Sequence, residues 1–333
     1  MSTNMRWGEF AENVVRRLIN PEKGKPFLII ADTATDPGLA QELLVAGIRS
    51  GADTQLLTYE RKAWGEKAVF GPIVANAVLN SKYIFGLHTN FCNQSFTREA
   101  LKKGARILST QPWGVEDFLI EGFLDIDYDA QVRNGWKVVD IWDKAKKCHI
   151  VSDSGTDISF SLEGRLTKNG DGLLTEDGEM DYFPGVQVTI APVEETINGI
   201  ISVDASDNIQ GVVAKPYTMT LEKGVITKVE GGLEASRMDE WLKSRNDPVI
   251  YHLCHFTIGL NPKAGISGNM IEDERLLGCV DFGFGSQPGS LGGTVGLSPY
   301  HMDVILGSPT IYIDDVVMID KNKLNYEFGF EEM

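Results

Sequence analysis

Two residues near the C-terminus, His301 and Asp303, combine metal-binding side chains with a spacing that brings them together. In an extended strand, residues two apart point to the same face, so this imidazole and this carboxylate would be directed at one point. The sequence Val304-Ile305-Leu306 that follows is typical of a strand. Because imidazole and carboxylate groups suit divalent transition metals, the pair predicts part of a metal site on a C-terminal strand.

A third metal ligand is available from a second histidine-containing segment, but the spacing leaves two candidates. His252 and His255 lie three residues apart within residues 249–259, whose composition is typical of a strand. On a strand these two side chains point to opposite faces, so only one of them can point to the site. The residues alone leave the choice open.

A glycine-dense segment, residues 281–293, lies between these two histidine-containing segments. Glycine lets the backbone come close to a ligand, which would place the segment at the site. Glycine also serves tight turns between strands, and the sequence taken alone favours turns here.

The elements that must position these residues change character along the chain. Up to about residue 147, short apolar runs alternate with amphipathic segments, and Asp36-Pro37 has the residues of a helix start. This alternation predicts a doubly wound parallel sheet. We expect strands at 26–32, 54–59, 83–87 and 106–109, and helices at 37–49, 72–80 and 97–103. Neither G-x-x-x-x-G-K-[ST] nor G-x-G-x-x-G follows the first strand, which argues against a nucleotide cofactor.

The second half of the chain reads as short alternating strands separated by glycine and acidic turns. We expect strands at 157–162, 186–190, 199–203 and 217–221, further strands within 301–319, and a helix at 235–244. The predicted fold class is therefore α/β plus α+β, with two domains. Residues 1–147 form a Rossmann-like α/β domain, and residues 148–333 form a β-rich catalytic domain that carries the metal site.

Composition excludes several classes of partner. The net charge is −16, from 31 basic and 47 acidic residues, and such a field repels nucleic acid. No apolar run reaches the roughly 18 residues that a membrane helix needs. The four cysteines form no C-x-x-C pair, and the N-terminus reads as an amphipathic helix rather than a signal peptide. We therefore expect a cytoplasmic protein.

Three C-terminal segments, residues 246–262, 272–293 and 299–303, together resemble the 2,5-dihydroxypyridine 5,6-dioxygenase family. They are similar, more distantly, to the aminopeptidase T family of metallopeptidases. The resemblance is strongest from about residue 184 to residue 315, and the first half matches mainly in its rhythm. It implies one non-haem Fe²⁺ per chain, held by His255, His301 and Asp303, and it selects His255 over His252.

The peptidase pattern requires a different set of ligands. It holds two metals, and it has a glutamate at the position of His255 and a histidine near Asp281. The glutamate that it also uses matches Glu274 in this chain. These departures favour one metal over two, because a two-metal centre needs more bridging ligands. Glu274 and Asp281 would then support the ligands from behind or lie in a solvated turn, although both could still serve a second metal.

The dioxygenase resemblance also implies residues outside the metal set. His88 would act as an acid or base, or bind substrate or dioxygen, with a structural loop histidine as the alternative. Glu176 would orient the substrate, although Glu179 competes for the same position. Ser286 would contact the substrate from the glycine-dense segment.

Taken together, the resemblance implies a non-haem iron(II) ring-cleaving dioxygenase of extradiol type. Its substrates would be dioxygen and a hydroxylated N-heteroaromatic, with 2,5-dihydroxypyridine converted to N-formylmaleamate as the expected reaction. It further implies a homo-oligomer. The alternatives are a metal-dependent aminopeptidase of the aminopeptidase T type and a non-catalytic binding protein on the same fold.

Overall fold

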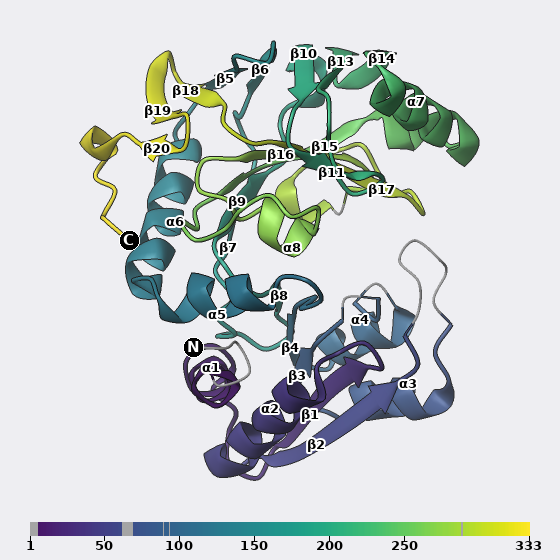
Figure 1. The fold of residues 1–333 in the computed structure, drawn as a ribbon, viewed down its shortest axis with the longest axis vertical. Coiled ribbons are helices and arrows are strands. Elements are labelled where there is room, and N and C mark those ends of the chain that lie inside the picture. Colours follow the sequence, from purple (N-terminus) through teal and green to yellow (C-terminus); the bar gives the residue numbers. More distant parts are fainter. Residues whose placement is uncertain (1–5, 62–68, 89, 93, 288) are drawn as a thin grey trace. The chain divides into compact units, whose positions relative to one another are not determined.

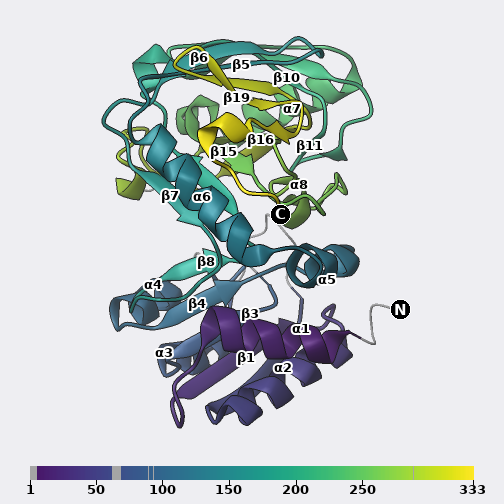
Figure 2. The same ribbon diagram turned by 90° about the vertical axis from the view of Figure 1, so that its left-hand side faces the viewer.

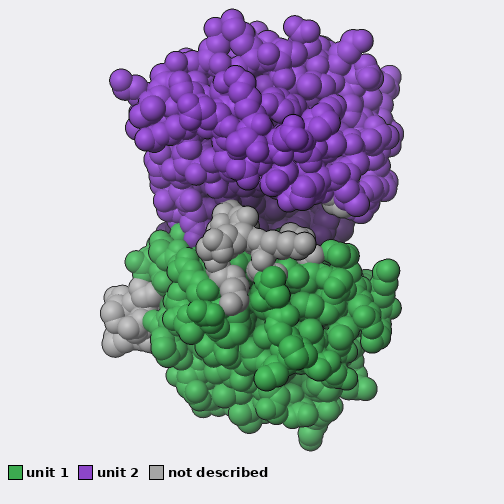
Figure 3. All heavy atoms as spheres, turned by 90° about the vertical axis from the view of Figure 1, so that its right-hand side faces the viewer, with its two compact units in different colours: residues 1–125, 171–185 green, residues 126–170, 186–333 purple. Residues whose placement is uncertain are grey.

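The computed structural model describes residues 6–61, 69–88, 90–92, 94–287 and 289–333, and groups the chain into two compact units. Unit 1 comprises residues 1–125 and 171–185, and unit 2 comprises residues 126–170 and 186–333 (Figure 3). Each unit therefore contains two separate stretches of chain. None of the described helices is long and apolar enough to cross a membrane.

Unit 1 is built on a parallel sheet with strand order β2-β1-β3-β4-β8, flanked by helices (Figure 1). Its strands are β1 (Pro26–Asp32), β2 (Asp53–Tyr59), β3 (Tyr83–Gly86), β4 (Arg106–Ser109) and β8 (Met180–Tyr182). Its helices are α1 (Trp7–Asn13), continued by a π-helical turn over Val14–Ile19, then α2 (Pro37–Ser50), α3 (Pro72–Leu79), α4 (Ser95–Lys102) and α5 (Glu116–Leu124).

Local signals in the sequence explain the regular part of unit 1. The side chain of Asp36 accepts hydrogen bonds from the backbone N–H groups of Gly38 and Leu39, so it caps α2 as predicted. Strand β1 is buried from its second residue to its last, which explains its continuous apolar run. The predicted alternation of strands and helices up to residue 109 is confirmed, with bounds shifted by at most two or three residues.

Unit 2 contains two antiparallel sheets (Figures 1 and 2). The sheet that carries the candidate site has the order β12-β11-β17-β16-β15-β9-β7, and the other has the order β14-β13-β10-β6-β5-β18-β19-β20. The first sheet comprises β7 (Thr167–Gly170), β9 (Gln187–Ile190), β11 (Ser206–Asp207), β12 (Gly211–Val212), β15 (Leu253–Gly259), β16 (Val280–Gly285) and β17 (His301–Leu306). The second comprises β5 (Lys147–Val151), β6 (Asp157–Ser161), β10 (Asn198–Val203), β13 (Tyr217–Glu222), β14 (Val225–Glu230), β18 (Thr310–Ile313), β19 (Val316–Asp320) and β20 (Lys323–Leu324).

One hydrophobic core joins the two sheets of unit 2 to its two longer helices. The helices of unit 2 are α6 (Tyr128–Trp142), α7 (Leu233–Arg245) and α8 (Met270–Asp273), with 3₁₀ turns at Glu194–Thr196, Pro248–Tyr251, Gly289–Leu291 and Tyr326–Phe328. Trp142 of α6 stacks on Phe256 of β15 with ring centroids 4.7 Å apart, and Phe160 of β6 packs against the same ring. Strand β15, which carries His255, is thus fixed from the core side.

The fold class is confirmed: a parallel α/β sheet and a large antiparallel region occur in one chain. The grouping by contacts differs from the chain-order division at residue 147, because α6 packs in the core of unit 2 and β8 pairs with β4 of unit 1. The domain limits 1–147 and 148–333 remain a prediction. The expectation of turns throughout the glycine-dense segment is wrong in its first part, because residues 281–285 belong to the buried strand β16.

Candidate metal centre

Three neighbouring strands bring the predicted metal ligands into one row. Strand β16 pairs with β15 on one side and with β17 on the other, both antiparallel. Gly283 of β16 lies opposite His255 of β15 and also opposite Asp303 of β17, while Gly285 lies opposite His301. The histidine and the aspartate therefore face each other across a glycine.

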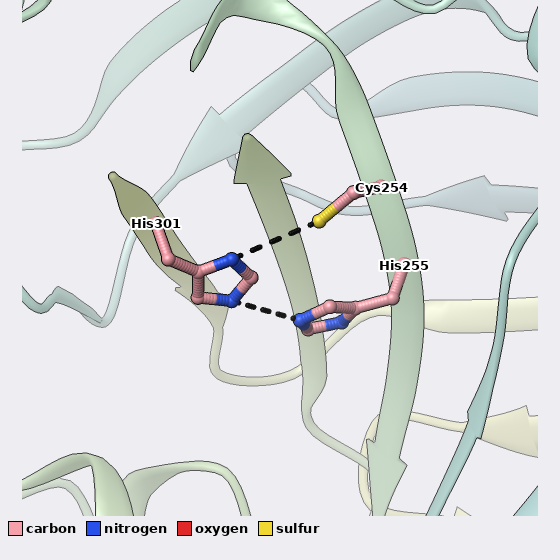
Figure 4. Close-up of side chains that lie close together, drawn as sticks. All are labelled: Cys254, His255 and His301. Carbon is pink, nitrogen blue, oxygen red and sulfur yellow. Dashed lines mark hydrogen bonds between the residues drawn. The ribbon is translucent and has the colours of Figure 1, made fainter. Parts of the chain in front are cut away.

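The donor atoms of the three predicted ligands lie close together. The Nε2 atoms of His255 and His301 are 3.2 Å apart, and the two rings are nearly parallel (Figure 4). Asp303 Oδ1 lies 2.9 Å from His301 Nε2 and 3.4 Å from His255 Nε2. His252 lies outside this group, because its Nδ1 faces the carbonyl oxygen of Pro248 at 3.1 Å.

Gly283 leaves the space that the His255 ring occupies. A Cβ atom at position 283 would lie 2.0 Å from His255 Nε2 and 2.4 Å from two ring carbons. Any side chain here would displace the ring, so the close approach of His255 to Asp303 requires glycine. The glycine-dense segment thus contributes to the candidate site through a glycine of strand β16 and not through a loop.

The atoms of the three ligands that face away from the group have their own neighbours. His255 Nδ1 lies 3.2 Å from the hydroxyl of Thr257, and Asn208 Nδ2 donates to Asp303 Oδ2 at 3.2 Å. His301 Nδ1 faces the sulfur of Cys254 at 3.9 Å. Because each outer atom has a neighbour, His255 Nε2, His301 Nε2 and Asp303 Oδ1 are left to face one another.

The protonation of the three residues follows from burial and from their mutual charges. Burial lowers the pKa of His255, which favours the neutral ring that a metal needs. Burial opposes ionisation of Asp303, but the two histidines outweigh it and lower the pKa of this carboxyl. Burial also opposes protonation of His301, yet Asp303 and Cys254 raise the pKa of the imidazole well above its usual range. A bound cation would therefore displace a proton from this group.

Two further carboxyl groups, predicted as supports, lie beside the three ligands. Asp281 Oδ2 of β16 is 3.8 Å from His255 Nδ1, and its other oxygen is buried without a hydrogen-bond partner among the described residues. Glu274 pairs with Arg275 at 2.9 Å. Burial raises the pKa of Glu274 to about 7, and burial with the charge of Asp303 raises the pKa of Asp281 well above its usual range.

The arrangement fits a divalent metal. Donors held about 2.1 Å from one ion lie about 3.0 Å apart in octahedral and about 3.4 Å apart in tetrahedral geometry. The three separations among His255, His301 and Asp303, 2.9, 3.2 and 3.4 Å, lie in this range. His255, Asp281 and Asp303 also place donor atoms within 4.8 Å of one another. Two imidazoles and a carboxylate on one face leave coordination positions open for other molecules.

His88, the predicted acid or base, belongs to unit 1. It follows strand β3, while Asp32 ends the neighbouring parallel strand β1, and the order of the strands reverses here because β2 lies on the other side of β1. His88 Nε2 lies 3.5 Å from Asp32 Oδ2, and the backbone N–H of Asn90 donates to His88 Nδ1 at 3.0 Å. The rings of Tyr59 and Trp113 pack on the imidazole. Open α/β sheets bind ligands at such a reversal.

The remaining predicted residues have less specific surroundings. Glu179 accepts the backbone N–H groups of Thr175 and Glu176 at 2.8 and 2.9 Å, so its carboxylate stabilises its own loop, whereas the side chain of Glu176 is exposed. Ser286 follows Gly285, the residue paired with His301, and is partly buried. Its position one residue beyond the ligand row is compatible with the predicted contact to substrate.

Several residues of the site were not identified in the sequence. Gly283, Thr257, Asn208 and Asp32 act through register or through long-range contacts, which composition and spacing reveal only in part. Gly283 falls in the glycine-dense segment, and Asp32 is a carboxylate at the end of a buried apolar run, where parallel sheets bind ligands.

Comparisons with known proteins identify a family that the chain matches along most of its length. A family model described as 2,5-dihydroxypyridine 5,6-dioxygenase matches residues 17–326. A curated 2,5-dihydroxypyridine 5,6-dioxygenase of Pseudomonas putida is 28% identical over 186 residues. That alignment covers 53% of this chain and 53% of the relative, so the match spans about half of each protein.

Two solved structures share the fold along almost the whole chain. The 2,5-dihydroxypyridine dioxygenase of Pseudomonas putida superposes with a TM-score of 0.78 at 21% identity, covering 97% of each chain. Wild-type AmpT of Thermus thermophilus superposes with a TM-score of 0.71 at 16% identity, covering 96% of this chain and 99% of the other. At these identities the likeness shows the fold alone.

Proposed function

The chain belongs to the 2,5-dihydroxypyridine 5,6-dioxygenase family, and we propose that it cleaves a hydroxylated N-heteroaromatic ring with dioxygen. One Fe²⁺ ion per chain would be held by His255, His301 and Asp303. The substrate that we propose is 2,5-dihydroxypyridine. The C5–C6 bond would break and both atoms of dioxygen would enter the product, N-formylmaleamate.

The observation that carries this proposal is the geometry of the three donors. Two imidazole nitrogens and one carboxylate oxygen lie 2.9 to 3.4 Å apart on one face of the sheet. Two histidines and one carboxylate are the ligands of many oxygen-activating iron(II) enzymes, because they leave positions open for substrate and dioxygen. When bound, iron(II) supplies the redox chemistry that lets dioxygen react with an electron-rich ring.

The charges of the ligands bear on the form of the substrate that would bind. Two neutral histidines and one ionised aspartate leave one positive charge on a divalent ion, and this charge favours a deprotonated ring hydroxyl. Asp281 and Glu274, whose pKa values are raised, would take up or release protons beside the site as the cation and the substrate arrive. The protein would thus favour the oxyanion of the substrate without a dedicated positive side chain.

Proton transfer to or from the ring is the role that we propose for His88. Because Nδ1 accepts the N–H of Asn90, the proton of the neutral ring lies on Nε2, on the side of Asp32. The histidine is therefore held in one tautomer. We further propose that Ser286 contacts the substrate and that Glu176 orients it. We also propose that the protein is a cytoplasmic homo-oligomer. Sedimentation of the purified chain would measure its oligomeric state.

The deciding experiment measures oxygen uptake. The protein is loaded with Fe²⁺ without oxygen, 2,5-dihydroxypyridine is added, and oxygen consumption and the ultraviolet band of the substrate are followed. We expect one oxygen molecule to be consumed for each substrate molecule. His301→Ala should abolish both signals, because it removes the ligand whose nitrogen lies 2.9 Å from Asp303.

Other outcomes would point to other functions. No uptake with one tightly bound iron per chain would reject this substrate and leave other hydroxylated rings to be tried. Two bound metals with hydrolysis of peptides and no use of oxygen would establish an aminopeptidase. Ligand binding without metal-dependent turnover would establish a binding protein.

A further inference from the structure

Cys254 lies beside His255 because strand β15 contains a bulge. In a regular strand neighbouring side chains point to opposite faces. Here Leu253 pairs with Phe284 and His255 pairs with Gly283, so Cys254 is an extra residue on β15. Bulges redirect side chains in this way, and both Cys254 and His255 point toward His301 (Figure 4).

The bulge is held by a buried side chain from the glycine-dense segment. Gln287 donates from Nε2 to the carbonyl oxygen of Cys254, and its Oε1 accepts the backbone N–H of Val295 at 3.0 Å. Its own backbone N–H donates to the carbonyl of Gly296 at 2.7 Å. A Cβ at position 293 would overlap the Gln287 amide at 2.0 Å, so glycine is required there also. The position of Cys254 is therefore fixed by several contacts.

The sulfur of Cys254 and two histidine nitrogens form a second possible donor set. Cys254 is completely buried, and its Sγ lies 3.9 Å from His301 Nδ1, on the ring edge away from Asp303. Donor atoms of Cys254, His255 and His301 all lie within 4.8 Å of one another. A sulfur and a nitrogen bound to one tetrahedral zinc, at about 2.3 and 2.1 Å, are about 3.6 Å apart, which is close to the separation here.

We propose that Cys254, His255 and His301 form a binding site for a thiophilic metal, Zn²⁺ or Cu⁺, which competes with the iron site proposed above. Thiolate ligands select soft metals, whereas carboxylates favour hard ones. Both sets use His255 and His301, so one occupant excludes the other. His301 would bind the soft metal through Nδ1 and iron through Nε2. The thiol of Cys254 would lose its proton to solvent as the metal–sulfur bond forms.

This inference shares two histidines with the proposed function but is tested separately from it. The full-length protein is freed of metal and loaded with Zn²⁺, and X-ray absorption at the zinc edge is recorded. We expect one sulfur neighbour at about 2.3 Å in the wild type. The sulfur neighbour should be lost in Cys254→Ala and kept in Cys148→Ala, which removes another fully buried thiol of unit 2. A zinc spectrum with only nitrogen and oxygen neighbours would overturn the proposal.

Metal affinities measured with a competing chelator give a second, independent test. Cys254→Ala should weaken Zn²⁺ binding by more than about tenfold and change Fe²⁺ binding by less than about threefold, and Asp303→Asn should do the reverse. Equal losses for both metals in Cys254→Ala would overturn the proposal, because Cys254 would then only position His301. Failure of oxygen uptake with an intact zinc–sulfur signal would reject the dioxygenase and leave this site standing.

Discussion

Two histidine environments of this protein, one in each unit, differ in what surrounds the imidazole nitrogens. In unit 2, His255 and His301 turn their Nε2 atoms toward each other and toward one carboxylate, with 3.2 Å between the nitrogens. In unit 1, His88 has one nitrogen facing Asp32 and the other accepting a backbone N–H. In unit 2 two imidazoles share one carboxylate, whereas in unit 1 a single imidazole has a carboxylate and a backbone N–H of its own.

The first environment is suited to binding a metal, and the second is suited to transferring a proton. Two nitrogens that face each other at such a distance repel unless a proton or a metal lies between them or beside them. A histidine between a carboxylate and an N–H donor instead keeps one tautomer and a defined proton. Substitutions in both environments test this difference.

The largest effect is expected from Gly283→Ala. The new Cβ would occupy the place of the His255 ring, while the backbone conformation suits alanine, so the ring would move and the strand would remain. We expect metal affinity to fall by about a hundredfold or more, with little change in the thermal unfolding temperature. Calorimetric titration with metal and circular dichroism would measure the two quantities.

Gly71→Ala is the matched control for this change, because a Cβ there meets no atom within 4 Å. Its metal affinity should equal that of the wild type. Unchanged affinity in Gly283→Ala would mean that His255 is not held over the glycine. The three strands would then not form a metal site together.

A smaller effect is expected from Asp32→Asn in unit 1. The substitution removes the negative charge that faces His88 Nε2 and so weakens the hold on the tautomer with its proton on that nitrogen. We expect kcat/KM to decrease about tenfold. Nitrogen-15 chemical shifts of the imidazole report the tautomer directly, without depending on turnover.

Asp53→Asn, on the exposed start of β2, serves as the control for loss of one negative charge in the same unit. Should Asp32→Asn alter the nitrogen shifts but not turnover, His88 would be a structural residue. Of the two histidine environments, only the one in unit 2 would then contribute to catalysis.

The last effect, on stability rather than on binding or turnover, is expected from Glu274→Gln. The folded-state pKa of this carboxyl, raised chiefly by burial, is about 7, above its unfolded value of 4.5. Its contribution to stability is therefore fully present below about pH 4.5 and is lost as the pH rises through about 7. The metal-free variant should lose less stability over this interval, by an amount on the order of 1–3 kcal/mol.

Urea unfolding at pH 5 and at pH 8, with and without metal, measures this contribution. Bound metal should remove the difference between wild type and variant, because the cation stabilises the ionised carboxyl. If the change in unfolding free energy from pH 5 to pH 8 is the same in the wild type and in the variant, the pKa of Glu274 is not raised.

Local features could be predicted from the sequence, and long-range features could not. The apolar run of β1 and the cap at Asp36 carry their structure in adjacent residues, and the pairing of His301 with Asp303 follows from a spacing of two. The bulge at Cys254 and the pairing of β8 with β4 depend on partners far along the chain. Hydrophobic periodicity does not encode such partners, so the sequence did not predict that α6 packs in unit 2 or that β8 pairs with β4.

The position of His255 illustrates the same limit. Its spacing from His252 is equally compatible with either histidine facing the site. The structure brings His255 to the other two ligands because Gly283 on the neighbouring strand has no side chain. Gly283, about thirty positions away in the sequence, thus determines that His255 and not His252 lies at the site.

The late arrival of strand β8 has a consequence for synthesis on the ribosome. Strand β4 ends at Ser109, but β8, which pairs with it, begins only at Met180, after residues that belong to unit 2. At translation rates of about 5–20 residues per second, the roughly 70 residues between them take roughly 4–14 s to emerge. During that time the nascent sheet has an open parallel edge, which attracts other strands. The newborn chain should therefore depend on chaperones at this stage, and slower codons after residue 109 should lower its yield.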